Sequence, residues 1–590
     1  MIDDSRVRSL FATRLKRALG ALTVGAVVCT GATVLPASAS ATSRAATISA
    51  ADVEFQTQAD GTYAGMPVFD GNVDHLDAYV ETLLNYLDYE GVVRWAQGMR
   101  GDYTIRSGPN AGNVVPGMLV WREGTQGIST DFPTALAMGQ TWNRELTGEI
   151  GSVIGDEGLY EQDYSESISS ASVLINSALQ DIRSNPLTGR LDEGIGEDPV
   201  LASELLSPMA EGISGIEAED NSDGFWTKAT LNTKHYTGYL AQWFREPGNS
   251  DIPQRAMMEY YSQPIEDAIE SGAVGGMLTS YGRWNGIPNS VSPMIKRAQE
   301  ASPWGEHGNL YTVPDNNADR HLALENSFSN GFDDRYTPSL DTATALMMIA
   351  DEGSIAVNTR GSESPLTGAL IDNVESGMYG VTREAVYAVA SSQVIPLIRM
   401  GLFNERDENG LPKHYPFLDE SALSGTPIDY TVAEHQDTAM RAAEEGLVLL
   451  KNDKNVLPLD SDDEIVVSGP LADARFKSVN AASTPELENA GLTPIQAIRE
   501  QFGDDTVFES DGEVVALKSV ATGKYLAHGE GASPAVEANA DAVSGATTFE
   551  SFAWGQDAYG LLSTTNDQWL QVSNNSVNVG GTQSFGTDNT

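Results

Sequence analysis

Residues 309–321 read Asn-Leu-Tyr-Thr-Val-Pro-Asp-Asn-Asn-Ala-Asp-Arg-His. The short apolar run 310–313 predicts a buried parallel strand that stops at Pro314. Asp315 follows at once, so its carboxylate would lie at the carboxyl end of a strand, the edge at which α/β barrels keep their chemistry. Asp315 is therefore the candidate reactive group. A strand-to-helix turn with an N-cap is the structural alternative, and the neighbouring segments decide between the two.

The segments before this strand repeat one alternation. Strands are expected at 117–121, 173–182, 225–232 and 273–281, and helices at 73–87, 131–154 (capped by Asp131), 199–213 and 255–269. Further helices are expected at 340–349, 366–374 and 382–401. Strands that alternate with helices indicate a parallel α/β architecture, and a (β/α)8-type catalytic barrel over 70–405 is the favoured closed form.

Polar side chains follow the predicted strands at the same end as Asp315. They are Glu123, Arg190, Lys234, His235 and Tyr281. Because the carboxyl ends of parallel strands meet at one rim, we expect these side chains to converge there. A lone Lys-His pair is usually structural, but several such positions on one rim favour a functional site.

The rest of the chain divides by composition. The Pro, Gly and charge-rich stretch 406–430 is typical of a linker. Residues 431–510 predict the start of a second α/β sandwich domain, with a long helix at 433–450, a strand at 464–468 and a helix at 493–502. Residues 513–590 have short β runs in which strand, polar turn, aromatic and Leu recur, so they predict an all-β module with an internal repeat.

Composition and the N-terminal segment exclude several function classes. The chain has 83 Asp plus Glu against 35 Lys plus Arg, a surface that repels phosphate backbones and anionic lipid, so a neutral ligand is favoured over nucleic acid. Residues 1–41 are typical of a secretory signal peptide cleaved near Ala39 or Ala41, and the single cysteine, Cys29, lies inside it. A mature chain without thiols cannot use cysteine catalysis, disulfides or thiolate metal ligands. No later apolar run reaches the ~20 residues that span a bilayer, so a secreted product without membrane insertion is expected.

Several stretches together resemble glycoside hydrolase family 3, the retaining, exo-acting β-glycosidases. They are 189–190 (Gly-Arg), 193–199 (Glu-Gly-Ile-Gly-Glu-Asp-Pro), 234–236 (Lys-His-Tyr), 280–281 (Ser-Tyr), 285–288 (Asn-Gly-Ile-Pro), 310–315, 445–452 (Glu-Gly-Leu-Val-Leu-Leu-Lys-Asn) and 457–459 (Leu-Pro-Leu). The likeness covers about 117–502 and rests on the order and spacing of these stretches. It implies hydrolysis of terminal, non-reducing β-linked sugars, of the β-glucosidase or β-xylosidase type.

The resemblance implies roles for the rim residues. Asp315 is expected to be the catalytic nucleophile, and Arg190, Lys234 and His235 to bind sugar hydroxyls in the first subsite. That chemistry suits these residue types, because a carboxylate can capture an oxocarbenium-like centre and nearby cations keep it ionised. Neither a metal nor an organic cofactor is required, and an oligosaccharide or glycoside is the expected partner.

Two positions depart from the family pattern. Where the family usually has an Asp that binds sugar hydroxyls, this chain has Glu123, and the nucleophile is followed by Asn316 instead of Trp. These changes leave open the sugar and the aromatic wall of the next subsite. Glu123 and Tyr281 remain expected substrate-binding residues.

The C-terminal module resembles the start of a fascin-like or ricin-like β-trefoil. Since such a fold needs three repeats and fewer than two are visible, and since the family takes its acid/base Glu from the second domain, that Glu is expected beyond residue 590.

Two other functions stay open. One is a catalytically weak carbohydrate-binding or scaffold protein that keeps the barrel without turnover. The other is an aldolase in which Lys234 forms a Schiff base. The oligomeric state is not predicted.

Overall fold

The computed structural model describes residues 49–579 with gaps. The gaps are 99–100, 118–119, 124–126, 161–172, 177–180, 186–187, 222–223, 243–244, 246–247, 304–309, 316–365, 378–379, 419–432, 462, 469–471, 473–491, 505–506, 511–512, 530–534, 556–557, 566–568 and 574–575. The predicted signal peptide, the predicted helix 340–349 and Asn316 lie outside the described residues.

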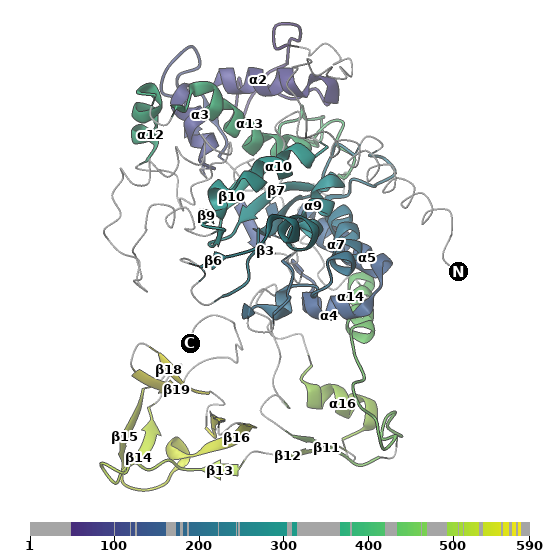
Figure 1. The fold of residues 1–590 in the computed structure, drawn as a ribbon, viewed down its shortest axis with the longest axis vertical. Coiled ribbons are helices and arrows are strands. Elements are labelled where there is room, and N and C mark those ends of the chain that lie inside the picture. The colour runs from purple at the N-terminus through teal and green to yellow at the C-terminus, as the bar shows by residue number, and fades with distance from the viewer. Residues whose placement is uncertain are drawn as a thin grey trace, which may run out of the picture. The chain divides into compact units, whose positions relative to one another are not determined.

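A parallel sheet forms the centre of the first part of the chain (Figure 1). Its strands are β3 (Val120–Glu123), β4 (Val173–Asn176), β5 (Thr230–Tyr236), β7 (Val274–Thr279) and β10 (Tyr311–Pro314), in the order β10-β7-β5-β4-β3. Every residue of β5, β7 and β10 is buried, as in a parallel sheet covered on both faces. Gly276 is needed at its position, because a Cβ there would come within 2.1 Å of the Tyr311 ring on the neighbouring strand.

Helices follow the strands and pack along this sheet. They are α4 (Ala135–Thr141), α5 (Arg144–Tyr160), α7 (Pro199–Ser214), α8 (Gln254–Ala256), the π-helical turn η4 (Met257–Tyr261), α9 (Gln263–Glu270) and α10 (Pro293–Ala301). Helix α7 begins where the Asp198 side chain accepts from the N–H groups of Val200 and Leu201, with Pro199 in its first turn. Helices α5 and α7 approach so closely that a Cβ on Gly151 would lie 2.2 Å from the carbonyl oxygen of Met209.

A second apolar cluster joins segments from both ends of the first part. It contains η1 (Val73–His75), α2 (Leu76–Tyr86), α3 (Tyr89–Ala96), α12 (Leu366–Glu375) and α13 (Arg383–Arg399). Arg399 is 1% exposed, and its guanidinium donates to the carbonyl oxygens of Phe225, Gly224 and Gly272, which joins the end of α13 to the chain before β5 and β7. Two small sheets accompany the main one: β1 (Tyr103–Thr104) with β2 (Val114–Val115), and β6 (Asn249–Ser250) with β8 (Arg283–Trp284) and β9 (Ile287–Pro288). The turn η5 (Asn289–Val291) follows β9.

The structure confirms most of the predicted elements and changes several of their bounds. Strand β4 ends at Asn176, so the predicted strand 173–182 is too long. The predicted helix 131–154 is two helices that break at Trp142, which has a left-handed φ of 53°, and the cap of α4 is Thr134, not Asp131. Strand β5 runs through Lys234 and His235, which were expected just beyond it.

The predicted linker is partly packed against the first part. In its described portion, Leu411 and Tyr415 are buried, and Tyr415 Oη donates to the carbonyl oxygen of Thr227 at 2.8 Å. Helix α14 (Ala433–Glu445) follows and contacts α4 and α5. It is shorter than the predicted helix 433–450, because it stops before Gly446 and residues 447–450 are exposed.

The C-terminal segments change from α/β to all-β structure, as predicted. Strands β11 (Ile465–Ser468) and β12 (Val507–Ser510) pair in parallel, with helix α16 (Pro494–Phe502) between them in the chain. Antiparallel strands follow: β13 (Glu513–Val515), β14 (Tyr525–His528), β15 (Val536–Ala540), β16 (Phe549–Gly555), β17 (Ala558–Ser563), β18 (Leu570–Ser573) and β19 (Ser576–Val579), with the turn η10 (Gly545–Thr547). Within the described ranges, no helix is both long and apolar enough to cross a bilayer.

Candidate active site

Backbone hydrogen bonds keep the carboxyl ends of β5, β7 and β10 at the same edge of the sheet. The N–H of Asp315 donates to the carbonyl oxygen of Thr279 at the end of β7, and the N–H of Ser280 donates to that of Tyr236 at the end of β5, both at 2.9 Å. This ladder places the residues that follow β5, β7 and β10 on one rim, as the sequence predicted for a parallel sheet.

Asp315 and His235 meet on this rim. Nε2 of His235 lies 3.3 Å from Oδ2 of Asp315, and the Asp315 side chain is 17% exposed while that of His235 is 2% exposed. Lys234 precedes His235 in β5 and is buried to the same degree. The carboxylate therefore sits at the mouth of the site, with the basic side chains deeper in it.

Asp181, which follows β4, holds His235 from the other side. Its Oδ2 accepts from the backbone N–H and from Nδ1 of His235, each at 2.9 Å. The buried guanidinium of Arg183 lies 3.8 Å from the same oxygen. His235 thus lies between two carboxylates, one behind each ring nitrogen.

Arg190 enters the site from the turn before η3 (Leu191–Glu193). Its Nε and Nη2 donate to the two oxygens of Glu193 at 2.6 and 2.5 Å, and its Nη1 lies 3.4 Å from Nε2 of His235. Burial by itself would lower the pKa of Arg190, but the bond to Glu193 and the charges of Glu193 and Asp315 raise it. Burial would raise the pKa of Glu193, but Arg190, with Lys234 and His235 adding, lowers it. Both side chains are charged, and the pair fixes the guanidinium beside His235.

Aromatic side chains line the same region. The rings of His235 and Tyr239 stack with centroids 5.1 Å apart, and the guanidinium of Arg245 lies 4.3 Å from the centroid of Tyr281. Burial lowers the pKa of Arg245, but the hydrogen bond to Tyr239 and the negative charge of Asp315 raise it. Tyr281 is 9% exposed, so little of its ring reaches solvent.

The structure therefore brings Asp315, Arg190, Lys234, His235 and Tyr281 to one rim. Glu123 is the last residue of β3 and not part of the following loop, and its side chain lies outside what the structure describes. Sequence reasoning missed the partners of these residues: Asp181, Arg183, Glu193, Tyr239 and Arg245. The one available signal was the three-residue spacing of Arg190 and Glu193, which suits an ion pair.

A buried carboxylate supports the loop that follows Glu123. Glu157 on α5 is 1% exposed and accepts from the N–H groups of Ser129 and Thr130 and from the Thr130 hydroxyl, at 2.6 to 3.0 Å. Nδ1 of His435 on α14 also lies 3.1 Å from Glu157. One carboxylate thus links the end of this rim loop to helix α14.

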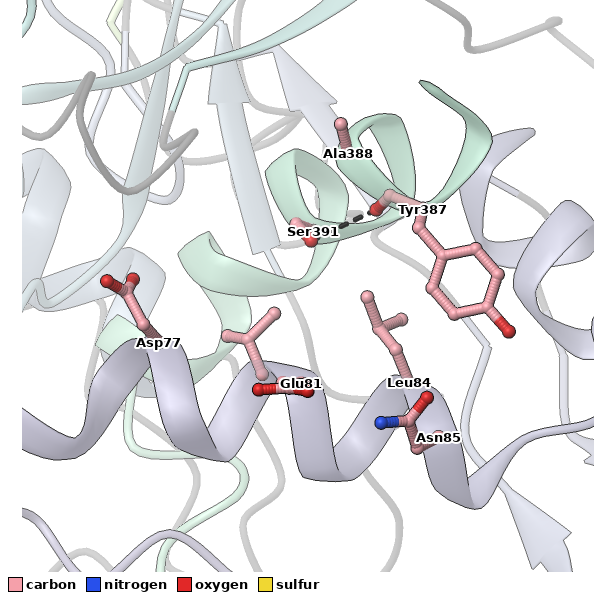
Figure 2. A pocket seen from close by; sticks show the side chains of 8 residues that line it. Asp77, Glu81, Leu84, Asn85, Tyr387, Ala388 and Ser391 are labelled. Atoms are coloured by element: carbon pink, nitrogen blue, oxygen red, sulfur yellow. Dashed lines mark hydrogen bonds between the residues drawn. The ribbon is translucent and has the colours of Figure 1, made fainter. Parts of the chain in front are cut away.

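A separate pocket of about 240 Å³ lies between α2 and α13 (Figure 2). Its walls include Asp77, Glu81, Asn85, Tyr387 and Ser391, and it shares no residue with the site on the rim. Among the residues with a described placement, no group of three or more His, Cys, Asp or Glu could hold a metal ion.

Comparison of the sequence with known protein families indicates the class of enzyme to which this site belongs. Residues 120–352 match the family model "Glycosyl hydrolase family 3 N terminal domain", and all six predicted site residues lie in that segment. The comparisons therefore support the family resemblance over these residues, and with it the class of glycoside hydrolase.

Curated relatives agree with that class. A β-xylosidase/α-L-arabinofuranosidase 2 from Medicago sativa subsp. varia is 26% identical over 64% of this chain and 44% of its own length. A periplasmic β-glucosidase from Salmonella typhimurium is 24% identical over the same shares. The chain thus spans less than half the length of these relatives.

Solved structures share the fold. A GH3 exo-β-xylosidase in complex with a xylobiose aziridine probe matches with a TM-score of 0.57 and 20% identity, over 76% of this chain and 54% of its own. A β-glucosidase from Erythrobacter marinus matches with a TM-score of 0.56 and 21% identity, over 74% and 58%. At such identities the likeness shows the α/β fold alone.

Proposed function

We propose that this protein is a retaining, exo-acting β-glycosidase that removes terminal β-linked sugars through a covalent glycosyl-enzyme on Asp315. The observation that carries the proposal is the position of Asp315. Its carboxylate stands at the open end of β10, 3.3 Å from His235 and within the electrostatic reach of Arg190 and Arg245, while its neighbours are buried.

The surrounding groups suit the two requirements of that reaction. A carboxylate among fixed cations is available as an ionised nucleophile, which can attack the anomeric carbon as the glycosidic bond breaks. Arg190, Lys234 and His235 offer N–H donors to sugar hydroxyls, and such bonds strengthen as positive charge develops on the ring. Tyr281, under Arg245, offers an aromatic wall.

We propose three further features of the chain. The central sheet belongs to a (β/α)8-type barrel, the antiparallel strands after β12 belong to a β-trefoil-like module, and the chain is secreted after cleavage near Ala39 or Ala41. The parallel order of β3, β4, β5, β7 and β10 supports the first, and the antiparallel pairing of β13 to β19 supports the second.

A panel of nitrophenyl β-glycosides tests the function. Nitrophenolate leaves with little protonation, so the result depends on the nucleophile and the sugar subsite more than on the acid/base. We expect turnover with a gluco- or xylo-configured substrate and its loss in Asp315→Asn. Binding of the sugars without turnover by the parent would instead indicate a carbohydrate-binding protein.

A further inference from the structure

Asp181 makes two hydrogen bonds to one residue and lies behind the site. It is 5% exposed, and its Oδ2 accepts from both the backbone N–H and Nδ1 of His235 at 2.9 Å. Because an ionised carboxylate can only accept, the ring proton of His235 must lie on Nδ1. The other ring nitrogen, Nε2, then faces the mouth of the site.

Nε2 of His235 has two polar neighbours, one a hydrogen-bond donor and the other an acceptor. Nη1 of Arg190, 3.4 Å away, can only donate, while Oδ2 of Asp315, 3.3 Å away, accepts when it is ionised. A bare Nε2 satisfies Arg190, and a protonated Nε2 satisfies Asp315. As long as Asp181 keeps a proton on Nδ1, Nε2 is the one position at which the ring can change between donor and acceptor.

We propose that Asp181 is a positioning residue, which fixes the Nδ1–H form of His235 and so presents Nε2 to Asp315 and to a bound sugar hydroxyl. This inference rests on the proposed glycosidase function and adds a residue to its machinery. Without the Asp181 acceptor, a neutral His235 could protonate Nε2 and leave Nδ1 bare, and the ring would be free to rotate away from Asp315.

Arg183 supplies the countercharge for this arrangement. Its guanidinium is buried, lies 3.8 Å from Oδ2 of Asp181, and its centre lies 5.8 Å from the centroid of Tyr239. None of its three nitrogens has a hydrogen-bond partner among the described residues, so it acts on Asp181 through charge. Both oxygen lone-pair directions of Asp181 Oδ2 thus remain available to His235.

The geometry excludes a different role for the pair. A His-Asp pair can act as an acid/base, but a retaining glycosidase needs about 5 Å between the nucleophile and the acid to hold the anomeric carbon and the leaving oxygen. Nε2 of His235 is 3.3 Å from Asp315, too near for the scissile bond to fit between them. His235 therefore binds and orients, and Asp181 acts through it.

The test combines ¹⁵N NMR of the imidazole rings with kinetics on nitrophenyl glycosides. The chain has seven histidines, so selective ¹⁵N-histidine labelling and a difference spectrum against His235→Gln identify the ring. The variants are Asp181→Asn, which keeps an oxygen acceptor, and Asp181→Leu, which removes it. Glu204→Gln, on the exposed side of α7, is the matched control for loss of one carboxylate.

We expect the parent to show a proton on Nδ1 of His235. Asp181→Asn should keep that signature and lose less than about tenfold in kcat/KM, whereas Asp181→Leu should lose the signature and about ten- to a hundredfold, mostly in kcat. A parent ring that is neutral with Nε2 protonated would overturn the proposal, even if Asp181→Leu does not fold. So would parent-like turnover and tautomer in a folded Asp181→Leu. Failure of the proposed function would appear separately, as no turnover of any glycoside by the parent, and the NMR result would still stand.

Discussion

Nε2 of His235 on β5 and Oδ2 of Asp315 after β10 lie 3.3 Å apart, although strand β7 lies between their strands in the sheet. The two side chains therefore meet above the end of β7, where Ser280 and Asp315 continue the backbone ladder. This contact joins the candidate nucleophile to a buried network that includes Asp181 and Arg190.

Replacement of Lys234 by Met should lower turnover more than stability. A charged hydrogen bond to a sugar hydroxyl that strengthens in the transition state is worth about 1.5 to 3 kcal/mol, so kcat should fall at least about tenfold. The measurement compares kcat and Tm of the variant with those of the parent. Lys228→Met is the control, because Lys228, which precedes β5, forms an ion pair with Asp156. The kcat of this control should stay near that of the parent. Unfolding of Lys234→Met at room temperature would show that Lys234 acts in folding instead.

Glu193→Gln should weaken the protein and change its response to acid. Loss of one partner of a buried ion pair lowers the free energy of unfolding by about 3 to 5 kcal/mol. In this variant Arg190 would lose its bidentate carboxylate partner. Because folding lowers the pKa of Glu193 below its ordinary 4.5, the pair contributes stability above pH 4.5, which is lost as the pH falls through the lower folded value.

Thermal melts at several pH values measure this effect. The Tm of the parent should fall more steeply below pH 4.5 than that of Glu193→Gln. The exposed pair of Glu405 and Lys413 provides the control, because Glu405→Gln should leave the slope unchanged. Parallel curves for the parent and Glu193→Gln would contradict the assigned pair.

Glu157→Gln should loosen the rim loop that follows Glu123. Both N–H groups, of Ser129 and Thr130, donate to Oε2, so the amide oxygen can keep them only if its NH2 group replaces Oε1, which the Thr130 hydroxyl and Nδ1 of His435 contact. A neutral oxygen also accepts more weakly than a carboxylate, so the loss should be about 1 kcal/mol. Hydrogen exchange of the Ser129 and Thr130 backbone amides should become faster, and KM should rise. Glu149→Gln, at an exposed position on the same helix, should change neither quantity. Unchanged exchange in Glu157→Gln would mean that the loop is held by other contacts.

The sequence predicted the parts of the site that depend on strand ends. An apolar run followed by a polar residue locates Asp315 after β10, and the same rule located the Lys234 and His235 pair, although β5 extends through it. Burial of a parallel sheet on both faces produces such runs, so they can be recognised in one sequence.

The partners of the site residues could not be predicted in the same way. Asp181 lies in the chain between β4 and β5 and contacts His235, and no periodicity of the sequence predicts a contact between residues 54 positions apart. The end of α14 was missed for a related reason. The apolar run 447–450 continues a helical pattern, but the helix ends before Gly446, whose Cβ would lie 2.9 Å from the carbonyl oxygen of Ala137 on a helix far away in the chain.

The role of Asp315 as nucleophile is tested most directly by mass spectrometry after incubation with slow 2-fluoro glycosides of gluco and xylo configuration. We expect the intact chain to gain the mass of one fluorosugar, the labelled peptide to contain Asp315, and Asp315→Asn to gain no label. A label on any other residue, together with parent-like turnover by Asp315→Asn, would contradict that role.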